Sequence, residues 1–325
     1  MTEPTYFAYI KLMGSKLSPR YFNGKEPGID EVYRVVSISK QAMVPVKLID
    51  GVHWLSENTY NFARKVLGVS TTYEAHEGVT FTGAKGAWLI IGEPKPVEPP
   101  IGAPKNEKYV VIETELSKKL GLEPFITEEK FVFRGFKGED VEVSRVTMYR
   151  YFIAAYERNG NPLTENELKK TLLWKNYLCK NEVTKVLGGI SEFLKKKLWY
   201  LERMSGYAMK QYKVVWRDVA KEFIPAIEVN GAVPDYTVNY IVVKNLEEAY
   251  YLLAILLAPQ INAVVSELSP WIGHVQPRFI EYFKIPAYNP ENSVHRQLVQ
   301  IGDIIHNKKI IQENLEKIKE LVEKL

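Results

Sequence analysis

The chain has 325 residues, of which 46% are hydrophobic and 25% are charged, and its formal net charge is +4. This composition excludes an intrinsically disordered chain and allows one large or two smaller globular domains. The single cysteine, Cys179, excludes an internal disulfide and a cysteine-based zinc site, so we expect a reducing, cytoplasmic location. No apolar run is long enough to span a bilayer and the first residues carry no export signal, so we expect no membrane association.

The first third of the chain is expected to contain strands and one helix. Apolar runs on either side of a turn-rich stretch predict two or more strands, and a helix follows over residues 56–67 with Ser56 as its N-cap. A proline-rich stretch at residues 93–106 predicts a surface loop or linker. Short alternating runs between residues 109 and 156 then predict strands joined by turns.

Helices become more frequent after residue 160. Thr164, followed by two glutamates, predicts the start of one helix, and a second is expected over residues 193–201. Short apolar runs at residues 214–216 and 240–243 predict buried strands. Asn245 predicts the N-cap of a helix that ends near a proline, Pro259.

After Pro290 the spacing of apolar residues predicts one long helix with a heptad seam. The seam is equally compatible with a helix docked on its own domain and with a partner helix from another subunit. Together, the elements predict a mixed α/β (α+β) fold, β-rich with helical insertions and a long C-terminal helix. We expect three parts, residues 1–70, 71–292 and 293–325.

The positive charge is concentrated in one stretch. Residues 193–221 contain eight Lys or Arg against Glu202 and Asp218, so this stretch carries +6 and the rest of the chain sums to −2. A local excess of this size is typical of a phosphate-binding surface, although a solvated helix face would look the same.

The residues that would support catalysis are missing from the sequence. No glycine-rich fingerprint lies between an expected strand and helix, so no nucleotide or S-adenosylmethionine site is expected. The pair Pro99-Pro100 lacks the polar residue before it and the aromatic residue after it that amino-methyltransferases use to hold a flipped base. The five histidines are scattered, and no Ser, Cys or carboxylate motif of a hydrolase or metal nuclease is present. We therefore expect no catalytic residues, no metal and no cofactor on this chain.

Three segments have the composition of binding elements. Residues 76–88 combine glycines and threonines with Lys85, residues 133–140 place Arg134 and Lys137 on a turn between aromatics, and residues 212–220 carry two cations around a short strand. Each segment also has a purely structural interpretation. The first would be a glycine-rich hairpin turn. In the second, Arg134 would pair with Glu139 or Asp140, and in the third, Arg217 would pair with Asp218.

In this order, the segments resemble the TaqI-like specificity domain, the target-recognition domain of adenine-specific DNA methyltransferases and fused restriction–modification enzymes. Residues 77–88 are similar to the opening element of that family, with Lys85 where an Asn is usual and Trp88 where a Phe is usual. Arg134-Gly with Asp140 is similar to its next element, and Ala155 replaces a usual proline. The resemblance covers about residues 70–305 and continues through residues 162–168, 199–200, 213–219, 248–256 and 285–292.

The resemblance implies a module that binds double-stranded DNA and selects the site of N6-adenine methylation, with S-adenosylmethionine bound only by a partner methyltransferase or nuclease chain. The residues expected to contact bases are Thr82, Lys85, Arg134 and Lys137. The residues expected to contact phosphates are Lys195, Lys196, Lys197, Lys213, Arg217 and Arg278. Two alternatives stay open, a protein–protein adaptor that uses the C-terminal heptads and an inactive remnant of a fused enzyme.

Overall fold

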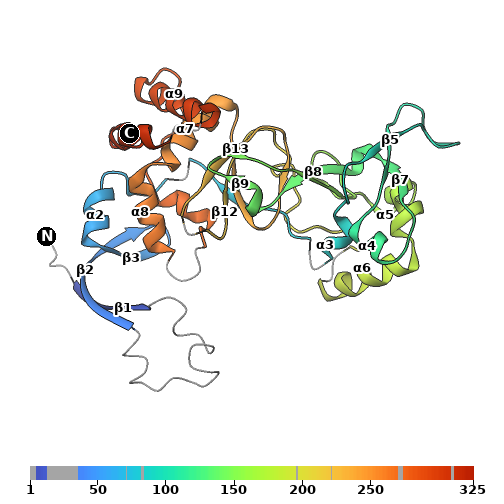
Figure 1. Ribbon diagram of the computed structural model, residues 1–325, viewed down its shortest axis with the longest axis horizontal. Helices are drawn as coiled ribbons and strands as arrows, with labels where there is room; N and C mark the ends of the chain where they lie inside the picture. Colours follow the sequence, from blue (N-terminus) through green and yellow to red (C-terminus); the bar gives the residue numbers. More distant parts are fainter. Residues whose placement is uncertain are drawn as a thin grey trace.

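The computed structural model describes residues 5–12, 36–70, 72–81, 84–194, 197–220, 222–269, 274–308 and 311–325. They form two lobes that lie end to end along the long axis of the molecule (Figure 1). The first lobe contains the C-terminus, and the second lies at the other end. Both helices and strands are present in several sheets, which confirms the expected mixed α/β class.

The strands of the described residues form four sheets. The first has the order β1-β2-β3 and consists of β1 (Thr5–Leu12), β2 (Val36–Leu48) and β3 (Gly51–Ser56). The second has six strands in the order β4 (Ala75–Glu77), β15 (Val238–Val242), β12 (Lys213–Arg217), β13 (Pro225–Glu228), β10 (Ser144–Val146) and β9 (Val141–Glu142). The third has the order β11 (Arg150–Ile153), β8 (Val132–Phe136) and β14 (Val233–Pro234). The fourth has the order β5 (Lys95–Val97), β6 (Tyr109–Ile112) and β7 (Phe125–Glu128).

The helices surround these sheets. The α-helices are α2 (Glu57–Ala63), α3 (Lys85–Trp88), α4 (Glu115–Lys119), α5 (Glu165–Leu168), α6 (Asn181–Leu194), α7 (Leu246–Leu256), α8 (Pro259–Leu268), α9 (Ser293–Lys308) and α10 (Leu315–Val322). Single turns of 3₁₀- or π-helix are η2 (Glu129–Phe131), η3 (Gly138–Asp140), η4 (Trp174–Leu178), η5 (Pro277–Tyr282) and η6 (Gln312–Asn314).

The six-stranded sheet separates two hydrophobic cores, because side chains alternate between its faces. On β12, Val214 and Trp216 belong to the first core and Val215 to the second. The same alternation places Ile227 and Ile241 in the first core and their neighbours Ala226 and Tyr240 in the second. A strand buried on both faces is apolar throughout, which is why residues 214–216 were correctly predicted as a buried strand.

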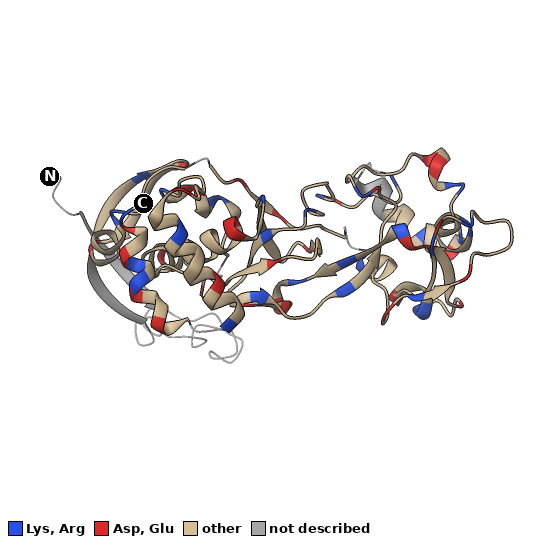
Figure 2. Ribbon diagram, turned by 90° about the horizontal axis from the view of Figure 1, so that it is seen from above, with Lys and Arg blue, Asp and Glu red and all other residues tan. Residues whose placement is uncertain are grey.

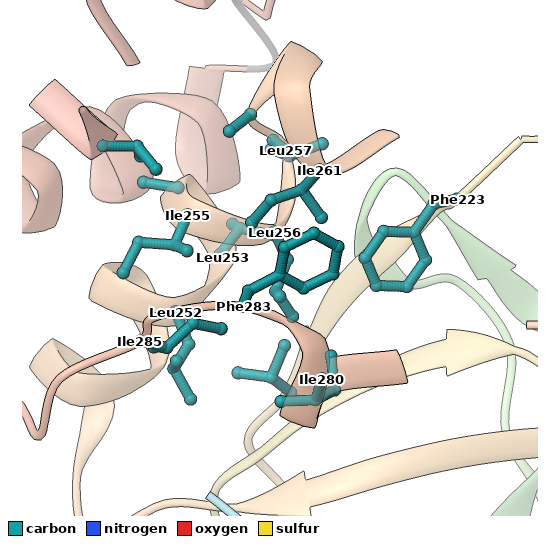
Figure 3. Packing of buried hydrophobic residues seen from close by; sticks show 14 of the residues in the cluster. Phe223, Leu252, Leu253, Ile255, Leu256, Leu257, Ile261, Ile280, Phe283 and Ile285 are labelled. Carbon is teal, nitrogen blue, oxygen red and sulfur yellow. The ribbon is translucent and has the colours of Figure 1, made fainter. Parts of the chain in front are cut away.

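The first core lies under α7 and α8. Figure 3 shows Leu252, Leu253 and Leu256 of α7 packed with Phe223, Ile261 and Phe283. Residues of all three predicted parts, 1–70, 71–292 and 293–325, contribute to this core. The second core lies in the other lobe and is built mainly from residues 79–208. The predicted division into three parts stays a prediction.

Several predicted helix starts are confirmed. The Ser56 hydroxyl accepts from the backbone N–H of Thr59 at the start of α2, and Thr164 caps α5 in a reciprocal capping box. The Asn245 side chain accepts from the N–H of Glu248 at the start of α7. Pro259 begins α8, where its fixed φ and missing N–H suit the first helical position.

Two helix predictions are wrong. A helix was expected over residues 193–201, but α6 spans Asn181–Leu194 and residues 197–201 are not helical. The buried face of α6 includes Val183 and Leu187, four residues apart. The single helix expected after Pro290 is instead α9 and α10 with the turn η6 near the break.

The C-terminal helices dock on their own chain. Ile301 and Ile305 of α9 and Ile318 of α10 are buried in the first core. α9 packs closely on α7, since a Cβ at Gly302 would lie 2.1 Å from the carbonyl oxygen of Tyr250. The structure therefore favours the intramolecular interpretation of the heptad spacing.

Among the described residues, no single helix has the length and hydropathy needed to cross a membrane. The bent pair α7 and α8, with 66° between the helices, meets that test only as a pair, and the residues of α7 are largely buried in the first core.

Candidate nucleic-acid interface

Strands β8 and β11 form an antiparallel ribbon whose two faces carry different groups. Arg134 lies opposite Tyr151 in the register, and Phe133 lies opposite Phe152. Because side chains alternate along a strand, Arg134 and Tyr151 share one face, whereas Phe133 and Phe152 share the other. The two phenylalanines are buried and stack with ring centroids 5.6 Å apart, so they fix the ribbon to the second core.

Arg134 is exposed and is held by aromatic rings. Its guanidinium carbon lies 5.4 Å from the ring centre of Tyr149 and 5.9 Å from that of Tyr151. The Tyr149 hydroxyl in turn accepts a hydrogen bond of 3.1 Å from the Asn230 side chain, and burial raises the pKa of this hydroxyl. Within the described part of the chain, Arg134 forms no ion pair. Its guanidinium therefore makes cation–π contacts with both rings, while its N–H donors are available to a ligand.

A groove of about 710 Å³ borders this face of the ribbon. Arg134, Tyr151 and Val132 form its wall on the ribbon side. Further cations and carboxylates line the rest of the groove, namely Lys108, Lys130, Arg158, Glu93, Glu107 and Glu129. The groove thus offers several hydrogen-bond donors and acceptors beside an aromatic ring, as a surface that reads base edges requires.

The opposite face of the ribbon carries cations that are already paired. Lys85, on α3, lies 3.1 Å from an Asp235 carboxylate oxygen and 5.8 Å from the exposed ring of Tyr236. The glycine-rich segment before it is tightly packed, since a Cβ at Gly78 would lie 2.1 Å from the carbonyl oxygen of Asp235. Lys85 and Arg134, the two leading candidates for base contacts, therefore lie on opposite faces of the ribbon and line different pockets.

The carboxylates of the η3 turn pair with cations other than Arg134. Glu139 lies 2.5 Å from the Lys137 ammonium and 2.8 Å from the Arg150 guanidinium, and Asp140 also bonds Arg150. The hydrogen bond from Lys137, together with the two positive charges, lowers the pKa of Glu139. The pairing that sequence analysis considered for Arg134 is therefore made by Arg150, which leaves Arg134 free for the groove.

The described cations of the basic stretch 193–221 do not all lie on the surface. The predicted phosphate contact at Lys213 is wrong, because its side chain is fully buried and its ammonium lies 3.2 Å from the equally buried carboxylate of Glu228. Burial lowers the pKa of this ammonium, and the Glu228 carboxylate opposes that effect. Arg203 pairs with Glu77 at 2.5 Å.

The remaining predicted phosphate contacts are dispersed. The half-buried Arg217 donates from Nε to the carbonyl oxygen of Val141 at 2.8 Å, and Arg278 pairs with Asp50 at 3.2 Å in the first lobe. Lys197 is exposed, with its ammonium 5.7 Å from the Trp199 ring. Figure 2 shows Lys and Arg spread over both lobes and on the strands between them. Thr82, Lys195 and Lys196 lie outside the described residues.

Sequence analysis missed Tyr149, Tyr151 and Arg158 as parts of the site. Tyr149 and Tyr151 are two aromatics separated by one residue, as on one face of a strand. Pairing of that strand with residues 132–136 would have placed them beside Arg134. No such signal identifies Arg158, which reaches the groove only through the packing of the loop after β11. In the described ranges, no group of three His, Cys, Asp or Glu is arranged to hold a metal ion.

No family model matches the chain, and no curated protein matches it. A search of solved structures finds similarity to the type IIG restriction endonuclease BpuSI, with a TM-score of 0.41 and 11% sequence identity over 98% of this chain. The match covers 39% of that enzyme, so this chain spans well under half of its length. At this TM-score the similarity carries no functional conclusion, and the resemblance to TaqI-like specificity domains stays a prediction.

Proposed function

We propose that this chain binds double-stranded DNA and reads a short base sequence, as the target-recognition part of a restriction–modification system. N6-adenine methylation, with its S-adenosylmethionine, would then reside on a separate catalytic domain or chain, and cleavage would belong there as well.

The observation that carries the proposal is the arrangement of Arg134. An arginine with two tyrosine rings within 6 Å and without an ion pair in the described part of the chain keeps its donors available to a ligand. Such a guanidinium can donate two parallel hydrogen bonds to O6 and N7 of guanine, the commonest specific contact in the major groove. The groove beside Arg134 contains further hydrogen-bond donors and acceptors, which could pair with the edges of neighbouring bases.

An adaptor role for the C-terminal heptads receives less support. Of the apolar residues that define the heptad spacing, Ile301, Ile318 and Val322 are buried in the chain's own first core, and Ile311 and Leu325 pack against it. They are therefore not available as a seam for a second helix. A partner methyltransferase or nuclease would have to bind elsewhere on the chain.

The test is selection of bound sequences from a pool of random duplex DNA, at increasing salt, with the purified full chain. The proposal predicts that a short motif is enriched and that motif-bearing duplexes stay bound at salt concentrations that release the rest of the pool, because phosphate contacts weaken with salt while base contacts remain. Absence of binding, or binding without enrichment of any motif, would contradict it.

A further inference from the structure

Two neighbouring cavities of the second lobe meet at the same pair of cations. The larger is the groove of about 710 Å³ beside Arg134, and the smaller has a volume of about 380 Å³. Lys130 and Arg158 line both of them. The two cavities are therefore adjacent, with these two side chains between them.

Arg158 is held rigidly at this junction. Its guanidinium carbon lies 4.3 Å from the centre of the Phe133 ring, and one of its terminal nitrogens donates to the carbonyl oxygen of Val132 at 2.9 Å. Both contacts are to β8, so the same strand that carries Arg134 also positions Arg158. Because a guanidinium has five N–H donors, this leaves donors for a ligand.

No carboxylate neutralises Arg158 in the part of the chain that the structure describes. Glu129 is near enough to act on it electrostatically but forms no ion pair with it, and burial lowers the pKa of the guanidinium. Lys130, by contrast, is bonded to Glu107 at 2.7 Å and its ammonium lies 5.4 Å from the Phe131 ring. A partly desolvated, unpaired cation is costly, and an anion bound beside it would remove that cost.

We propose that a phosphodiester group of the DNA backbone binds to Arg158 and Lys130 at the junction of the two cavities. This inference rests on the proposed function and adds to it where one strand of the DNA would run. Val132 and Arg134 are two residues apart, about 7 Å along the strand. Since successive nucleotides of a strand rise about 3.4 Å, the phosphate at Arg158 would belong to a nucleotide within about two steps of the base at Arg134.

The test measures the dissociation constant of the full chain for two duplexes, one with the selected motif and one scrambled, over a salt series. Arg158→Gln is compared with the wild type and with Arg158→Lys, which keeps the charge. Arg296→Gln is the matched control, because Arg296 also donates to backbone carbonyls, those of Pro290 and Glu291, but lines neither cavity. Melting temperatures establish that each variant is folded.

A phosphate contact at Arg158 predicts that Arg158→Gln lowers the slope of log K against log salt by about 0.9 on both duplexes. Arg158→Lys and Arg296→Gln should keep the wild-type slope. An unchanged slope for Arg158→Gln, with normal wild-type binding, would overturn this inference and leave the proposed function standing. Absence of wild-type DNA binding would overturn the proposed function itself. If Arg158→Gln does not fold, Lys130→Gln decides in its place, with the same lowered slope supporting the inference and an unchanged slope overturning it.

Discussion

Lys213 and Glu228 lie opposite each other on β12 and β13 and form an ion pair that is completely enclosed between the two lobes. Glu228 also accepts hydrogen bonds from the backbone N–H groups of Asn230 and Ala232, and the Lys213 ammonium also donates to the carbonyl oxygen of Lys210. The Glu228 carboxylate thus satisfies backbone N–H groups of the turn after β13, next to the Asn230–Tyr149 contact. Its enclosure gives the pair a structural role.

Breaking this pair should be costly. Lys213→Met is expected to lower the free energy of unfolding by about 3–5 kcal/mol, because it leaves the Glu228 carboxylate buried without a counter-charge. Adding Glu228→Gln should restore part of the loss, since the amide is neutral and its oxygen can still accept from the two N–H groups. Urea unfolding measures both. Lys65→Met, which breaks the exposed pair with Glu323, should cost at most about 1 kcal/mol. Equal losses in the two lysine variants would contradict the structural role.

The close approach of α9 to α7 is tested by Gly302→Ala. The added methyl would meet the Tyr250 carbonyl, so the helices must move apart, and we expect a loss of about 1–3 kcal/mol of stability. Gly189→Ala in α6 is the control, because nothing lies within 4 Å of its Cβ and alanine favours a helix by about 0.5–1 kcal/mol. Thermal unfolding should shift in opposite directions for the two variants. A neutral Gly302→Ala would show that the helices are packed less closely.

Tyr149 should matter for DNA binding through its ring. Tyr149→Phe keeps the ring beside Arg134 and is expected to bind DNA nearly as the wild type does. Tyr149→Leu removes the stacking partner, and a cation–π contact of about 0.5–1 kcal/mol corresponds to binding that is about 2- to 5-fold weaker. Titration of both variants with the selected duplex distinguishes them. The same loss in both would assign the effect to the hydroxyl and its bond to Asn230.

Glu139 holds Lys137 and Arg150 in ion pairs. The pKa of its carboxyl is lowered by Lys137 and Arg150, so both pairs are intact at neutral pH and are lost only as the pH falls through that lowered pKa. Glu139→Gln frees Lys137 at pH 7, whereas Arg150 keeps its bond to Asp140. If the chain binds DNA as proposed, the affinity for scrambled duplex should rise, with a salt slope larger by up to about 0.9 for the one new phosphate contact. An unchanged slope would place DNA away from this face of the ribbon.

The sequence was sufficient for local features and insufficient for the arrangement of the site. The caps at Ser56, Thr164 and Asn245 could be predicted because the capping bond is made within three residues. The position of α6 could not be predicted, because the lysines that follow it in the sequence obscure where its apolar face ends. That Lys213 is buried could not be predicted either, because its partner Glu228 lies on a neighbouring strand and its sequence neighbours resemble a basic surface segment.

Arg134 shows the same difference between features that the local sequence predicts and features that depend on the fold. Its position between aromatics was visible in the sequence, and this made it a candidate. The turn expected at Arg134 is wrong, because the residue lies within β8. Its separation from Lys85 depends on the strand register and on the packing of α3, which are tertiary features. Local patterns therefore identified which residues could bind, and only the fold decided which of them share a surface.

The most direct test of the central claim is a comparison of wild type and Arg134→Gln on the selected motif with every base pair substituted in turn. The account predicts that Arg134→Gln loses about 1–3 kcal/mol of discrimination, roughly 5- to 150-fold, at one G·C position only, while its melting temperature stays that of the wild type. Discrimination that is unchanged at every position, or that is lost equally at all of them, would contradict a base-reading role for Arg134.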